Sequence, residues 1–361
     1  MSLRSIGFPG LPLSGLSRRT ILLALAASIA GAVAAGGTSG PSPSVAFSGP
    51  VDPGGGVPPD VQGAAGPDHL LAMLNTTFVA QRKSDGAVVR TWSPAEFWSP
   101  VSGGDRLFDP RVLWDSGAER WVAVIATEGV AAAPAILLAV SETSDPTAGW
   151  TFRKLPVGGQ AYAEFPLLGS NARWIVVTSN LVSGTTGYLA GTAIWAIDKA
   201  ALLAGSPGAT RFTLDSPGSP IAPAVTFDPD APDELLLQQA DGNDIGHGRI
   251  RLFRISDAGA GPALAAPVLL SVGETWGDLP SPLESLPQAD TTRHIVSDQD
   301  EFSSVCVRHG KIWAVQTATL PASAGTPAHT VVQWWRIGED GKVEGFGRIG
   351  DPAGKTWLGF P

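Results

Sequence analysis

The chain of 361 residues is acidic, with a formal net charge of −9, and only 16% of its residues are charged. An acidic chain without a basic cluster binds nucleic acid poorly, so we expect no nucleic-acid partner. Apolar residues make up 43% of the chain and include 12 Trp, which is enough for a large core. The single cysteine, Cys306, excludes an intramolecular disulfide and a cysteine zinc site.

The first 35 residues have the pattern of an export signal. Arg18 and Arg19 precede an apolar run over residues 21–33, and Ala32-Val33-Ala34 is a small-x-small cleavage site. The paired arginines resemble a twin-arginine signal, and the general secretory route is the alternative. The run is too short and too rich in Ala and Gly to favour a membrane span.

We therefore expect residues 1–35 to be a signal peptide and the protein to be exported, either periplasmic or extracellular. No membrane span is expected after cleavage. Residues 36–59 are rich in Gly, Pro and Ser and predict a flexible linker. Residues 60–361 are expected to form the folded domain.

A β-rich run that closes at a polar turn recurs along this domain. The last residues before the turns are Arg82, Val140, Ile197, Ile255 and Ile337, with spacings of 58, 57, 58 and 82. A second series of apolar runs precedes it, for example RWVAVIA at 120–126 and RWIVVTS at 173–179. A period in the fifties with about four strands per repeat favours an all-β protein, a β-propeller of four-stranded blades.

Five units are visible, at about 60–105, 106–160, 161–218, 219–290 and 291–351. Residues 356–361 match the start of a sixth unit, which predicts a propeller of six or seven blades that is truncated in this chain. An insertion at about 270–297 accounts for the long spacing. A β-sandwich and a β-solenoid are the alternatives, but a sandwich needs no equal periods and a solenoid usually has shorter ones.

The segments FDPRVLWD…RWVAV, LLAVSETSDPTAGW, IWAIDKAALLAG and LPQAD…GKIWAVQT resemble a family of exported bacterial proteins predicted to form β-propellers. Most members of that family are of uncharacterised function, and the architecture is distantly sialidase-like. The shared motifs are structural, so the resemblance implies a fold and hardly any activity. The chain has no clean sialidase Asp box.

In propellers the innermost strands line a central channel, and function usually gathers at one mouth of it. Four of the five predicted inner strands start at a carboxylate, in three cases Asp60, Asp109 and Glu164, and in the fifth unit Asp300 with Glu301. Such a ring predicts either a cation site or the paired carboxylates of glycoside cleavage. The alternative is that each acid caps a turn or pairs with a base.

Three further features extend the candidate site. Arg111 lies beside Asp109 and could hold a carboxylated ligand. Asp298, Asp300 and Glu301 have alternating oxygens that are compatible with Ca²⁺, the one metal cofactor suggested. Trp276, in the insertion, is the candidate for stacking on a sugar ring.

The remaining tryptophans are predicted to pack between blades where they occupy repeated strand positions, as Trp121, Trp174, Trp195 and Trp313 do. We expect a monomer that binds an unknown ligand, either a glycan or a protein, at the channel mouth and rim loops. The alternative is a glycan-active hydrolase or lyase that uses Asp109, Arg111, Glu164 and Glu301. A quinoprotein-like oxidoreductase is a third and weaker hypothesis.

Overall fold

The computed structural model describes residues 42–55, 58–129, 133–206, 208–215, 218–277, 284–287, 294–296, 301–320 and 329–350. The chain divides into two units, Met1–Ala46 and Phe47–Pro361. The described part of the first unit, residues 42–46, contains no helix or strand. All that follows concerns the second unit.

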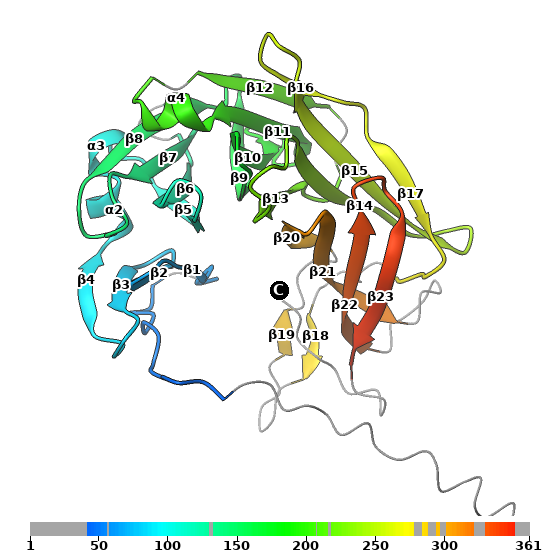
Figure 1. Cartoon of the computed structure of the whole chain (residues 1–361), viewed down its shortest axis with the longest axis horizontal. Coiled ribbons are helices and arrows are strands. Elements are labelled where there is room, and N and C mark those ends of the chain that lie inside the picture. The colour runs from blue at the N-terminus through cyan, green and yellow to red at the C-terminus, as the bar shows by residue number, and fades with distance from the viewer. Residues whose placement is uncertain are drawn as a thin grey trace, which may run out of the picture. The chain divides into compact units, whose positions relative to one another are not determined.

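The first two sheets are antiparallel and have four strands each, in chain order (Figure 1). The first sheet consists of β1 (Gln62–Ala65), β2 (His69–Met73), β3 (Phe78–Arg82) and β4 (Val88–Trp92). Two short helices follow it, α2 (Pro94–Phe97) and α3 (Ser99–Ser102). The second sheet consists of β5 (Leu107–Asp115), β6 (Arg120–Thr127), β7 (Ala135–Ser141) and β8 (Trp150–Pro156).

The third and fourth repeats have the same up-and-down order. The third consists of β9 (Ala161–Ser170), β10 (Trp174–Ser183), β11 (Leu189–Asp198) and β12 (Ala209–Leu214), with the helix α4 (Lys199–Leu203) between the last two. The fourth consists of β13 (Ala222–Thr226), β14 (Glu234–Asp244), β15 (His247–Asp257), β16 (Pro262–Leu264) and β17 (Val268–Val272). Strands β16 and β17 both pair with β15, so this blade has five strands where four were predicted.

The fifth repeat consists of β20 (Phe302–Arg308), β21 (Lys311–Leu320), β22 (His329–Gly338) and β23 (Val343–Ile349). A separate two-stranded sheet, β18 (Glu284–Pro287) with β19 (His294–Val296), lies in the predicted insertion. The predicted sixth unit at 356–361 lies outside the described residues.

The first strand of each repeat lies innermost (Figure 1). These strands contact one another in chain order, β1 against β5, β5 against β9, β9 against β13 and β13 against β20. The last three pair in parallel, for example Val225 with Ser170 and Ala224 with Val305. One cavity of about 460 Å³ is lined by residues of all five strands, which is the central channel of a β-propeller.

The burial of the strands follows from their place in the blade. The middle strands β6 and β7 are sandwiched between neighbouring sheets, so every residue of β7 is buried and its sequence AILLAVS is apolar up to the final Ser141. The outer strands β4 and β8 are more exposed and carry polar residues. The equal spacings of the sequence therefore reflect one packing environment that is repeated in each blade. Among the described residues, no helix is long and apolar enough to cross a membrane.

Candidate functional site at one mouth of the channel

The first three inner strands each have a residue in the left-handed region of backbone space, just before β1 and within β5 and β9. These residues are Asp60 (φ 47°), Asp109 (φ 55°) and Phe165 (φ 53°). Such angles are uncommon outside glycine, and for a bulky Phe they are a true outlier. Backbone strain of this kind tends to gather at functional sites.

Two of these residues sit in equivalent β-bulges. On β5 the pair Asp109-Pro110 lies opposite the single residue Ile125, and on β9 the pair Phe165-Pro166 lies opposite Ser179. Bulges bend a strand and change the direction of its side chains. The chain is thus kinked just where β5 and β9 enter the channel.

Side chains from one blade hold the bulge of the next. Asn75, in the turn between β2 and β3, accepts a hydrogen bond at Oδ1 from the backbone N–H of Asp109 (2.8 Å). Its Nδ2 donates to Asp60 Oδ2 (2.5 Å) and to the carbonyl of Pro58 (3.2 Å). Asp109 Oδ2 in turn accepts from the backbone N–H of Phe165 (2.9 Å). These bonds tie together the starts of the first three inner strands.

The carboxyl groups of Asp60 and Asp109 are hydrogen-bonded to each other. Two carboxylates in contact cannot both ionise freely, so one proton is shared between them. Partial burial, the Asp109 charge and this hydrogen bond raise the pKa of Asp60 to about 6, while the bond from Asn75 acts in the opposite direction. Burial also raises the pKa of Asp109, against the backbone N–H of Phe165 and the bond from Asp60.

Glu164 and Arg111 complete the charges at this mouth. Glu164 is exposed, precedes the bulge of β9, and its charge acts on both Asp109 and Tyr162. Arg111 donates from Nε to the carbonyl of Pro166 (3.0 Å), and its guanidinium lies over the ring of Phe165 at 4.8 Å. Burial lowers the pKa of Arg111, while the charges of Asp109, Asp60 and Glu301 raise it. Arginine remains charged at any pH of interest.

The structure brings four of the acids that the sequence singles out into one group of interacting charges. Asp60, Asp109 and Arg111 interact directly or through charge, Glu164 acts on Asp109, and the buried Glu301 acts on Arg111. Arg111 also lines the channel cavity, so it lies between the acidic mouth and the channel. The site thus has one carboxyl, Asp60, with a pKa of about 6, and a second, exposed carboxyl, Glu164, at the same mouth.

Asp298 and Asp300, proposed with Glu301 as a Ca²⁺ site, lie outside the described residues. No cluster of three or more His, Cys, Asp or Glu with metal-binding geometry occurs in the part of the chain that the structure describes. Glu301 itself is buried, and the interaction that the structure gives it is with the charge of Arg111.

Trp276 is not a sugar-stacking residue, which corrects the sequence prediction. Its side chain is fully buried and meets Trp335 edge to face, with ring centroids 5.7 Å apart. Its ring covers Gly242 and Gly248, where any Cβ atom would collide with it. Position in an insertion suggested exposure, but the chain turns back there and the ring fills the core of the fourth and fifth blades.

One of the four tryptophans expected to pack between blades is instead partly exposed. Trp121, Trp174 and Trp195 are buried as predicted, but Trp313 is 40% exposed. It stacks on Trp334 with centroids 6.5 Å apart, and Arg336 lies over its ring.

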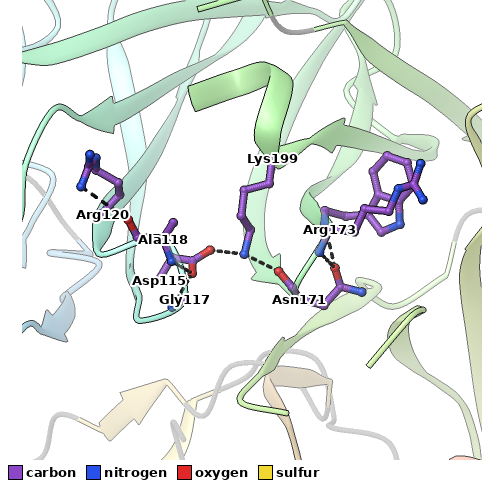
Figure 2. Close-up of polar contacts among 8 residues, drawn as sticks. Asp115, Gly117, Ala118, Arg120, Asn171, Arg173 and Lys199 are labelled. Carbon is purple, nitrogen blue, oxygen red and sulfur yellow. Dashed lines mark hydrogen bonds and ion pairs between the residues drawn. The ribbon is translucent and has the colours of Figure 1, made fainter. Parts of the chain in front are cut away.

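The opposite end of the inner strands also carries a carboxylate, but one that is fully engaged (Figure 2). Asp115, the last residue of β5, accepts hydrogen bonds at Oδ1 from the backbone N–H groups of Gly117 and Ala118, both 3.0 Å. Its other oxygen forms an ion pair with Lys199 of α4, and the ammonium group also donates to the carbonyl of Asn171. The side chains of Lys199 and Asp115 are only 11% and 5% exposed.

Sequence reasoning missed Asn75 and this ion pair. Asn75 lies in the ordinary turn sequence LNTT, and nothing local shows that it reaches two carboxyl-bearing residues. Asp115 begins the turn DSGA, a pattern that predicts side-chain capping of a turn. That Lys199 comes from the neighbouring blade to meet it depends on the packing of blades, which has no local signal.

No family profile matches the chain. No curated protein matches it either. Solved structures of similar fold include the GH43 endo-arabinanase from Bacillus licheniformis, which is 14% identical with a TM-score of 0.38, covering 79% of this chain and 96% of that one.

An exo-1,5-α-L-arabinanase from a bovine ruminal metagenomic library is 12% identical with a TM-score of 0.38, covering 81% and 96%. A neuraminidase-like protein of A/flat-faced bat/Peru is 11% identical with a TM-score of 0.41, covering 78% and 72%. These likenesses assign no substrate and no reaction. The identification that the residues themselves carry is that of an all-β, propeller-type chain with an acidic channel mouth.

Proposed function

We propose that this protein hydrolyses glycosidic bonds at the acidic mouth of its channel, with Asp60, Asp109 and Glu164 as the reacting carboxyl groups. The observation that carries the proposal is the hydrogen-bonded pair of Asp60 and Asp109, in which the pKa of Asp60 is raised to about 6. Glycoside hydrolysis needs one carboxyl that gives a proton and a second that receives one. A mouth with two coupled acids and a third nearby can meet both needs.

The roles follow from the surroundings of each carboxyl. Below pH 6 Asp60 still carries a proton, because its pKa is raised. It gives this proton to the leaving oxygen as the glycosidic C–O bond breaks. Glu164, which is exposed at the same mouth, takes a proton from the attacking water as the oxygen of that water bonds to the anomeric carbon.

Asp109 acts on the other two acids through its charge. It is held at Oδ2 by the N–H of Phe165, and it interacts electrostatically with both Asp60 and Glu164. A proton passes from Glu164 back to Asp60 through water before the next turnover, which balances the reaction. No cofactor is consumed or needed for these steps.

The test is release of reducing sugar from a panel of neutral, acidic and amino glycans at pH 5 to 8, with and without a Ca²⁺ chelator. Activity on at least one glycan that is lost in Glu164→Gln supports the proposal. A panel with tight glycan binding and no cleavage would instead support a non-catalytic binding module.

We further propose that the protein is exported, with residues 1–35 removed as a signal peptide. Arg18, Arg19 and the apolar run that follows them support this. Replacing both arginines with lysine should keep the full-length chain inside the cell if the twin-arginine route is used. Continued export of that variant would favour the general secretory route.

A further inference from the structure

The side chain of Asn75 contacts both halves of the acid pair. Its amide oxygen accepts the N–H of Asp109 (2.8 Å), and its amide nitrogen donates to Asp60 Oδ2 (2.5 Å). The backbone N–H of Asn75 also donates to the carbonyl of Pro59 (2.9 Å), next to Asp60. Asn75 itself is half-buried, which strengthens these bonds relative to exposed ones.

The oxygen and the nitrogen of the Asn75 side-chain amide have different roles. The oxygen end satisfies the N–H of a residue in the left-handed region, so it stabilises the bulge from which the Asp109 carboxyl projects. The nitrogen end can only donate, so it favours an ionised carboxylate over a protonated carboxyl at Asp60 Oδ2. An amide supplies an acceptor and a donor together, whereas an ionised aspartate or a leucine at this position would not.

We propose that Asn75 is a positioning residue that holds Asp60 and Asp109 against each other and keeps the shared proton off the Asp60 oxygen that it binds. The proton is thereby restricted to the remaining oxygen of Asp60 and to Asp109. The acid that the proposed hydrolysis requires thus carries its proton on the oxygen that Asn75 does not bind. This inference rests on the proposed function for its catalytic meaning, but its structural content does not depend on any substrate.

The charged groups around Asp60 must be considered with this residue. Asp109 and Arg111 act on Asp60 from β5, where the first raises its pKa and the second lowers it. Glu164, from β9, and Glu301 act on this group of charges through Asp109 and Arg111. The bond from Asn75 lowers the pKa of Asp60, in the same direction as Arg111.

The experiment compares Asn75→Asp with wild type by titrating the side-chain ¹³Cγ of Asp60 in labelled full-length protein. Aspartate keeps the oxygen that accepts the Asp109 N–H but replaces the donor with a second oxygen. Loss of the donor and addition of a like charge should raise the titration midpoint of Asp60 by about one unit or more. Asn75→Leu, which removes both bonds without adding charge, should raise it by less.

Asn243→Asp is the matched control, because Asn243 is exposed in the β14–β15 hairpin and its Oδ1 accepts a local bond from the N–H of Gly246. It adds the same charge and should leave the Asp60 midpoint unchanged. An unchanged Asp60 midpoint in both folded Asn75 variants would overturn the proposal. An Asp60 midpoint that rises as much in Asn243→Asp as in Asn75→Asp would also overturn it.

A measurement on the wild type alone covers the case in which a variant fails to fold. The side-chain amide ¹⁵N and ¹H signals of Asn75 should shift with pH and share the midpoint of Asp60, since the amide donates to that carboxyl. Signals that do not move between pH 4 and 8 would contradict the inference. Because neither readout needs a substrate, absence of glycan hydrolysis would defeat the proposed function while leaving this inference to be judged separately.

Discussion

Strand β5 carries an aspartate near each end, and the two carboxyl groups have opposite environments. Asp109 lies in a bulge with a left-handed backbone, in hydrogen-bonded contact with a second carboxyl. Asp115 ends the strand in a regular turn and is neutralised by Lys199. One end of the strand thus stores unfavourable backbone and charge interactions, while the other pairs its carboxylate with an ammonium group and with backbone N–H groups.

This difference separates function from stability within one strand. A buried ion pair such as that of Asp115 is costly to break, because removal of one partner leaves an uncompensated charge. Coupled acids such as Asp60 and Asp109 are costly to keep, and their removal relieves repulsion. We therefore expect substitutions at the end with Asp60 and Asp109 to lower activity but not stability. Substitutions at the end with Asp115 should lower stability but not activity.

The largest expected effect is on catalysis at the acidic mouth. Asp60→Asn and Glu164→Gln should each lower the rate of glycan hydrolysis by about 10²- to 10⁴-fold, because each removes a proton-transfer group. The rates would be measured as initial velocities at saturating glycan. Asp115→Asn is the matched comparison and should keep most of the wild-type rate at a temperature at which it remains folded. An equal loss of hydrolysis rate in Asp115→Asn would contradict the expected difference between the two ends.

The next effect is on stability at the opposite end. Asp115→Ala should lower the free energy of unfolding by about 3–5 kcal/mol, because it leaves Lys199 buried without a partner. Urea unfolding followed by tryptophan fluorescence measures this change. The double substitution Asp115→Leu with Lys199→Met should recover most of the loss. A loss of under about 1 kcal/mol in the single variant would mean that the pair behaves like a surface ion pair.

The smallest effect is a pH dependence of stability that comes from the acid pair. The pKa of Asp60 is raised from 3.8 to about 6 in the folded chain, so the native state binds more protons than the unfolded state between these values. Stability should therefore fall as pH rises from about 4 to about 6, and the raised pKa of Asp109 acts in the same direction.

Asp60→Asn removes the ionisation at this position, so this variant should melt above the wild type at pH 8, with the advantage shrinking toward pH 4. The melting temperatures of both proteins across this range provide the test. If the two curves remain parallel, Asp60 is not ionising in the way described.

The repeat could be predicted from the sequence because each blade places its strands in the same environment. The spacing of Val140, Ile197 and Ile255 reflects that environment, and all three are buried. The fifth strand of the fourth blade could not be predicted, since β16 is only three residues long and pairs by its place beside β15. The prediction that Trp276 is exposed was wrong for a related reason, because burial of a residue in an insertion depends on how the insertion packs.

The candidate site could be predicted in part. The acids that start the inner strands are visible because the repeat aligns them, which brings Asp60, Asp109 and Glu164 to one mouth. Their coupling could not be predicted, since it depends on the left-handed backbone of Asp109 and on the clamp from Asn75. Both arise where blades meet, and a repeat pattern describes only what happens within one blade.

The most direct test of this account compares two curves from the wild-type protein. One is the ¹³Cγ titration of Asp60, and the other is the fall of the glycan hydrolysis rate with pH under conditions of low substrate. Both should have a midpoint near pH 6, because the protonated carboxyl of Asp60 acts as the acid in the free enzyme. A midpoint of Asp60 near its ordinary value of 3.8, or a rate that does not change across pH 5 to 7, would contradict it.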